Sequence, residues 1–64
     1  MAGWNNLPQD IKPVINNTIR QARQYGKAEA NYYGYSVVAR TGADVGMVFV
    51  YVLNGIKLEA AMRF

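Results

Sequence analysis

Cysteine and histidine are absent from this 64-residue chain, and Asp and Glu together number only four. Without cysteine, the chain can form neither a disulfide nor a thiolate zinc site. Without histidine, it lacks the commonest general base and metal ligand. Because the four carboxylates are also scattered along the sequence, we expect no enzyme, no catalytic or metal-binding residues, no cofactor and no small-molecule substrate.

Charge is scarce as well. Charged residues make up 17% of the chain and hydrophobic residues 52%, whereas typical domains are roughly 25% charged. The formal net charge of +3 comes without any run of Lys or Arg, so the sequence predicts no nucleic-acid partner. A chain of fewer than about 70 residues rarely buries a sufficient core, and small folds therefore rely on external support. The composition favours a surface that is covered by a membrane or by another chain.

An irregular leader and a long amphipathic helix are expected in the first half of the chain. Residues 1–8 are rich in Gly, Asn and Pro, which disfavour regular structure. In residues 9–33, apolar side chains such as Ile11 and Ile15 recur at spacings of three and four, while residues such as Arg20 occupy the opposite face. This spacing is typical of an amphipathic helix.

Residues 34–57 form the most apolar stretch and are interpreted as a single transmembrane helix, followed by a tail of residues 58–64. Its longest uncharged part is residues 45–56, which is short for a span, whereas the whole stretch is long enough to cross a bilayer. Arg40 and Asp44 then fall inside the membrane. Because they are four residues apart, a helix would bring them together as an intramembrane ion pair.

Small and aromatic residues supply the expected contacts of this span. Gly42 and Gly46 are spaced as a small-xxx-small pair, which lets helices approach closely. With their small neighbours they form the expected helix-packing face of Ala39, Gly42, Ala43 and Gly46. Tyrosine and tryptophan favour the membrane–water boundary, although tyrosines can equally cap a protein core. The expected interfacial aromatics are Trp4, Tyr32, Tyr33 and Tyr35.

A β-hairpin is the competing interpretation of the same region. Val48–Leu53 is dense in β-branched and aromatic residues, and Asn54 and Gly55 follow at once. Asn-Gly between apolar runs is a strong hairpin signal. Residues 58–64, however, are mostly good helix formers. Both interpretations stay open from the residues alone.

Two stretches resemble those of a known family. Residues 14–33 (VINNTIRQARQYGKAEANYY) are similar to its N-terminal amphipathic segment, which ends in aromatic residues. Residues 43–57 (ADVGMVFVYVLNGIK) resemble its single span, which begins near an acidic residue and ends at a basic one. The family is subunit g of the mitochondrial ATP synthase, and Asp44 would take the acidic position. The resemblance implies an inner-membrane protein that holds ATP synthase monomers together and helps to shape the membrane.

The favoured interpretation is an all-α protein in which an N-terminal amphipathic helix precedes one transmembrane helix. The protein would then be a non-catalytic structural subunit of a multi-subunit complex in the mitochondrial inner membrane, with the ATP synthase as the candidate. Its partners would be other membrane subunits and the lipid bilayer. The alternative is a small α+β fold that acts as a soluble homodimeric interaction module, built from the helix and the C-terminal hairpin.

Overall fold

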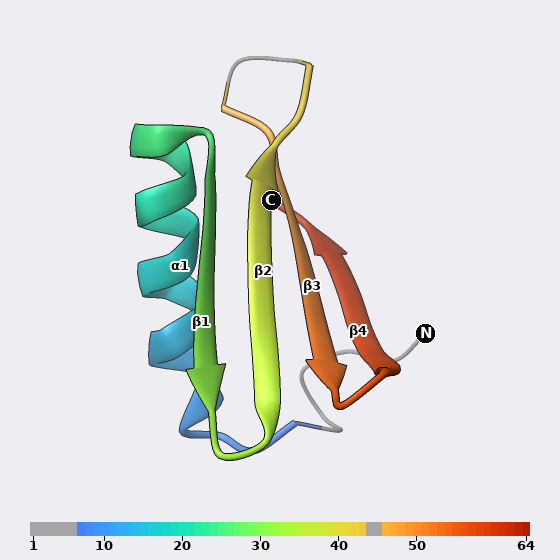
Figure 1. Cartoon of the computed structure of the whole chain (residues 1–64). Coiled ribbons are helices and arrows are strands. Elements are labelled where there is room, and N and C mark those ends of the chain that lie inside the picture. The colour runs from blue at the N-terminus through green and yellow to red at the C-terminus, as the bar shows by residue number, and fades with distance from the viewer. Residues whose placement is uncertain (1–6, 44–45) are drawn as a thin grey trace.

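The computed structural model describes residues 7–43 and 46–64, which form one helix packed on a four-stranded antiparallel sheet (Figure 1). The strands follow one another across the sheet in the order β1-β2-β3-β4. In chain order the elements are α1 (Ile11–Tyr25), β1 (Lys27–Tyr32), β2 (Tyr35–Thr41), β3 (Val48–Asn54) and β4 (Lys57–Arg63). The chain is therefore a helix followed by a β-meander, in which each strand pairs with its neighbour in sequence.

The helix α1 begins near the expected position and ends much earlier than expected. Its apolar stripe is buried against the sheet and includes Thr18, whose hydroxyl donates a hydrogen bond of 2.6 Å to the Val14 carbonyl. Gly26 ends the helix in the left-handed conformation (φ 92°), and its N–H donates to the Ala22 carbonyl at 2.7 Å. Glycine is the residue that adopts this conformation most easily, so the helix stops here and does not continue to residue 33.

Two tight turns create the hairpins. Between β1 and β2, Tyr33 (φ 44°) and Gly34 (φ 87°) both adopt positive φ, which matches the twist of the flanking strands. Between β3 and β4, Gly55 (φ 66°) and Ile56 connect the strands. The Asn-Gly signal therefore marks a real hairpin, and its second strand continues to Arg63 despite the helix-forming residues in that segment.

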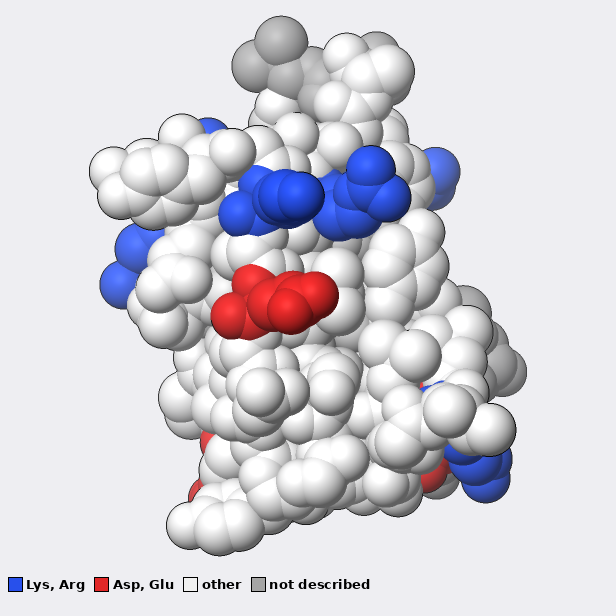
Figure 2. All heavy atoms as spheres, in the orientation of Figure 1, with Lys and Arg blue, Asp and Glu red and all other residues white. Residues whose placement is uncertain are grey.

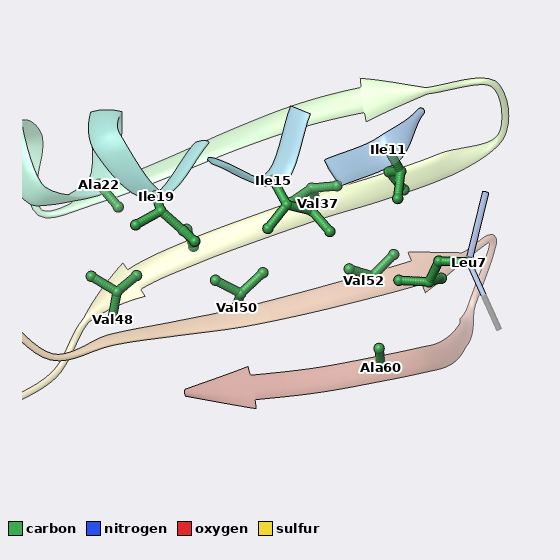
Figure 3. Packing of buried hydrophobic residues seen from close by; sticks show 11 residues of the cluster. Leu7, Ile11, Ile15, Ile19, Ala22, Val37, Val48, Val50, Val52 and Ala60 are labelled. Carbon is green, nitrogen blue, oxygen red and sulfur yellow. The ribbon is translucent and has the colours of Figure 1, made fainter. Parts of the chain in front are cut away.

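The core lies between α1 and one face of the sheet (Figure 3). Val48, Val50 and Val52 alternate along β3 and point at the helix, as a strand with one buried face requires. The helix packs mainly on β1 and β2 and makes a smaller contact with β3. Leu7 extends this layer toward β4 and lies near Val52 and Ala60. In the part of the chain that the structure describes, no helix lies over the opposite side of the sheet, which we call the open face.

The all-α prediction with a transmembrane helix is wrong, and the α+β alternative matches the fold. In the described parts of the chain, no helix combines the length and the hydropathy that a bilayer crossing demands. The segment 34–57 contains all of β2 and β3, and its Gly34, Gly46 and Gly55 take positive φ, which interrupts any helix. The expected membrane span and the inner-membrane location based on it are overturned.

Candidate functional site

Within residues 7–43 and 46–64, no strand pairs with the outer edge of β4, so some of its backbone groups face outward. Phe64 and Val48 exchange two backbone hydrogen bonds, of 2.9 and 3.0 Å. Hydrogen-bonded pairs alternate along an antiparallel ladder, so Met62 and Ala60 also direct their N–H and C=O groups toward β3. The intervening Ala61 and Arg63 therefore direct theirs away from the sheet. We call this outward side of β4 the β4 edge.

Apolar side chains are exposed around the β4 edge. Leu58 is 54% exposed and Phe64 is 42% exposed, while Ile56 in the preceding turn is fully exposed. The helix layer lies over β1 and β2 and reaches β3, as Figure 1 also shows. Beside the end of β4, a depression of about 270 Å³ remains between α1 and the chain terminus, lined by Asn16, Ile19, Arg20, Arg23 and Phe64. This end of the molecule is therefore less completely covered than the β1 side.

A bulge interrupts β4 near its start. Val52 pairs with Ala60 but Leu53 pairs with Leu58, so Glu59 is the extra residue. Its carboxylate lies 3.8 Å from the Lys57 ammonium. Beyond the bulge, residues 60–63 pair regularly with β3. The regular part of the β4 edge therefore begins at Ala60, directly after Glu59.

The open face carries a row of basic and aromatic side chains that crosses all four strands. Lys27 pairs with Arg40, Arg40 with Phe49, and Phe49 with Arg63. Residues directly opposite one another point to the same face, so these four side chains share the open face. In Figure 2, two basic groups lie side by side over β1 and β2, with an acidic group just below them. We call Lys27, Arg40, Phe49 and Arg63 the basic–aromatic row.

A second row on the open face is largely apolar. It consists of Glu29, Val38, Tyr51 and Ala61, and Tyr51 is 38% exposed. Tyr51 is two residues from Phe49 on β3, so the two rings are neighbours on one face. The Phe49 ring lies against Gly42, since a Cβ added there would be 2.7 Å from Phe49 Cε2. The open face thus combines two aromatic rings with adjacent cations.

Lys27 and Arg40 lie at the rim of a shallow depression of about 560 Å³, which Ala28, Glu29 and Val38 complete. Within residues 7–43 and 46–64, neither Lys27 nor Arg40 has a carboxylate within 4 Å, and the ion pair that the structure shows is Lys57–Glu59 on β4. Like charges placed directly opposite on adjacent strands destabilise a sheet. The Lys27–Arg40 pair is therefore a place where an anion would lower the electrostatic energy.

Of the expected interfacial aromatics, Tyr32, Tyr33 and Tyr35 surround the β1–β2 turn. The rings of Tyr32 and Tyr33 meet edge to face with centroids 4.8 Å apart. Tyr32 and Tyr35 pack against the core, whereas Tyr33 is exposed. Partial burial and the neighbouring Asp10 carboxylate raise the pKa of Tyr32. Tyr32 and Tyr35 therefore cap one end of the core. Trp4 lies outside the described residues.

The expected helix-packing residues do not share a helix. Ala39 is buried in β2 beneath α1. Gly42, Ala43 and Gly46 belong to the connection between β2 and β3. Arg40 is an exposed residue of β2, so the helical spacing that would pair it with Asp44 does not apply, and Asp44 lies outside the described residues.

Comparisons of the chain with protein-family models, with curated proteins and with solved structures give no match. They leave the resemblance to subunit g untested, although the single span that it implied is absent from the fold described above. The class of protein therefore rests on the architecture: a small α+β domain in which the described residues leave the β4 edge and the open face of the sheet uncovered.

Proposed function

We propose that the chain is a non-catalytic interaction module that forms a two-fold homodimer by pairing its β4 strand with β4 of a second copy. The observation that carries this proposal is the β4 edge, where outward backbone groups lie next to exposed Leu58 and Phe64. An uncovered edge strand is a template for another strand. Two-fold dimers are also the commonest closed assemblies.

The other edge of the sheet is less suitable for pairing. The apolar side chains of β1, such as Ala28 and Tyr32, already pack against the core below α1. The residues that alternate with them along β1 are Lys27, Glu29 and Asn31, which are polar and exposed. Charged side chains are a common means of blocking an edge strand. The proposal therefore places the dimer at β4 and not at β1.

Charge selects one register for the paired β4 strands. If Ala61 lies on the two-fold axis, Glu59 faces the partner's Arg63, and Ala60 faces the partner's Met62. If the axis passes through Ala60, Lys57 faces the partner's Arg63, which repels it. Opposite charges in directly facing positions are favourable, and like charges are unfavourable. The register centred on Ala61 is therefore the proposed one.

This register also uses the backbone groups of the β4 edge. Ala61 directs its N–H and C=O outward, so the two copies of Ala61 would exchange a pair of hydrogen bonds across the axis. Each net hydrogen bond contributes about 0.5–1.5 kcal/mol. Removing the two Ala61 hydrogen bonds at the two-fold axis should therefore weaken the dimer by about 1–3 kcal/mol, which raises the dissociation constant about 5- to 150-fold.

Sedimentation equilibrium of the full chain tests the proposal. The wild type should fit a monomer–dimer equilibrium, and Ala61→Pro should shift it toward monomer. Proline is compatible with an edge strand where the missing N–H faces outward. Glu29→Pro is the matched control, because it places proline at an outward position of the opposite edge. A monomeric wild type, or equal effects of the two prolines, would overturn the proposal.

A charge exchange tests the register. Glu59→Arg should weaken the dimer because two guanidinium groups then face each other across the interface. Arg63→Glu should also weaken it, because two carboxylates then face each other. The double variant should restore association. Lys57→Ala is the control, since it removes the intrachain pair with Glu59 and leaves the proposed interchain pair. If the double variant is no better than the singles, another register or another surface is used.

A further inference from the structure

Lys27 and Arg40 form a cationic pair for which the fold provides no counter-ion at contact distance in its described part. They face each other across β1 and β2, although they are far apart in sequence. Both are exposed, and together with Ala28, Glu29 and Val38 they line a depression of about 560 Å³. Paired cations at a depression suit a phosphate group, which accepts several charge-assisted hydrogen bonds.

The adjacent strand supplies aromatic surface. Phe49 lies next to Arg40 in the basic–aromatic row, and Tyr51 follows two residues later on the same face. Neighbouring strands are about 4.8 Å apart, so the cations and the rings are within reach of one extended ligand. Sheets of four antiparallel strands can stack two or three bases on such rings.

From these observations we infer that the open face binds single-stranded nucleic acid, with phosphates at Lys27 and Arg40 and bases stacked on Phe49 and Tyr51. The inference concerns a surface other than the β4 edge, so it holds for a monomer as well as a dimer. The sequence contains no run of Lys or Arg and therefore predicts no such partner. The hairpin register changes that expectation, because it aligns residues that are far apart in sequence.

Single strands fit the open face better than duplexes. Stacking on Phe49 and Tyr51 needs unpaired bases, whereas a duplex hides the faces of its bases. An anionic membrane would bind Lys27 and Arg40, but it would not distinguish aromatic rings from equally apolar aliphatic side chains. An acidic peptide would likewise lack the bases. The effects of ring substitutions therefore distinguish these occupants.

Fluorescence anisotropy with a labelled oligothymidylate of about 16 nucleotides and the full chain is the direct test. Arg40→Gln should weaken binding and reduce its salt dependence, since one phosphate contact is lost. Arg20→Gln removes the same charge from the exposed side of α1 and is the matched control. Glu29→Gln should strengthen binding, because it removes an anion from the rim of the depression.

Two substitutions at Tyr51 test stacking. Tyr51→Phe keeps the ring and should retain affinity. Tyr51→Leu keeps an apolar side chain without the ring and should weaken binding about 5- to 150-fold, since stacking contributes about 1–3 kcal/mol per base. Circular dichroism checks that both variants keep the wild-type fold.

Several outcomes would overturn the inference. These are the absence of binding at low salt, equal losses for Arg40→Gln and Arg20→Gln, or equal affinity of Tyr51→Leu and wild type. Equal affinity for a duplex of the same length, or binding only to vesicles with anionic lipid, would also contradict it. Ala61→Pro should still bind oligothymidylate at each monomer, so failure of the dimer and failure of this inference are distinguishable.

Discussion

Ile15→Ala should remove a large part of the stability of this small domain. Ile15 is completely buried at the centre of α1, where Figure 3 shows it beside Val37 of the sheet. Isoleucine-to-alanine changes in a core cost about 2–5 kcal/mol, since apolar burial is lost and a cavity forms. At about 0.05–0.15 kcal/mol per residue, a domain of this length has a total stability of only about 3–10 kcal/mol.

The same chemical change at Ile56 is the matched control. Ile56 is fully exposed in the β3–β4 turn, and it would lie beyond the paired residues of the proposed dimer. Exposed substitutions of this kind usually change stability by less than about 0.5 kcal/mol. Urea unfolding followed by circular dichroism gives both free energies of unfolding.

A graded variant keeps the comparison informative if Ile15→Ala does not fold. Ile15→Val should cost about 0.5–1.5 kcal/mol, which is measurable in the same assay. Equal destabilisation by Ile15→Ala and Ile56→Ala, or no loss in Ile15→Val, would refute the packing of α1 on the sheet.

Three further predictions concern the turns and the tyrosine cluster. Gly26→Ala should lower the stability by about 1–2 kcal/mol, because alanine adopts the left-handed conformation of this helix end poorly, and thermal unfolding by circular dichroism measures the loss. Gly42→Ala should displace the Phe49 ring, since the added Cβ would lie 2.7 Å from Phe49 Cε2, and a shift of the Phe49 ring protons in NMR spectra reports it; unchanged shifts would contradict the contact. The raised pKa of Tyr32 means that the folded state disfavours the ionised form of this residue. Tyr32 therefore lowers the free energy of unfolding as the pH rises above the unfolded-state pKa of about 10. In urea unfolding at increasing alkaline pH, Tyr32→Phe should lose less stability than the wild type.

The helix α1 was predictable from its sequence, but its C-terminal end at Tyr25 was not. The spacing of Ile11, Ile15 and Ile19 predicts the buried stripe that α1 presents to the sheet. Beyond Gly26 the apolar residues also fit a period of two, because Ala28, Ala30 and Tyr32 alternate with polar residues. An alternating pattern and a helical pattern agree by chance over a short segment. The left-handed glycine decides between them.

The strand β4 was the hardest element to predict. Its residues from Leu58 to Met62 favour helices in isolation, yet they form an edge strand. Pairing with β3 and burial of Ala60 outweigh a weak intrinsic preference. The Asn54-Gly55 signal favoured the hairpin correctly, while the bulge at Glu59 has no evident sequence signature.

The basic–aromatic row contains a signal that sequence analysis alone could have used. A two-residue turn at Tyr33 and Gly34 places residues at equal distances from the turn opposite one another, which brings Lys27 beside Arg40. Without the turn, the two residues look like isolated charges. The pairing of β2 with β3 depends on a longer connection, so the position of Phe49 in the row required the structure.

The absence of cysteine from the natural chain makes one measurement especially direct. In the proposed dimer, Ala61 lies on the two-fold axis opposite its own copy, as a hydrogen-bonded pair with Cα atoms about 5.5 Å apart. That separation suits a disulfide. Ser36→Cys, on the open face of the inner strand β2, is the control.

Mild oxidation followed by non-reducing electrophoresis compares the two single-cysteine variants. The proposed β4 pairing predicts that Ala61→Cys converts to a covalent dimer at protein concentrations where Ser36→Cys remains monomeric. Ala61→Cys that stays monomeric, or equal cross-linking of the two variants, would contradict a homodimer built on the β4 edge.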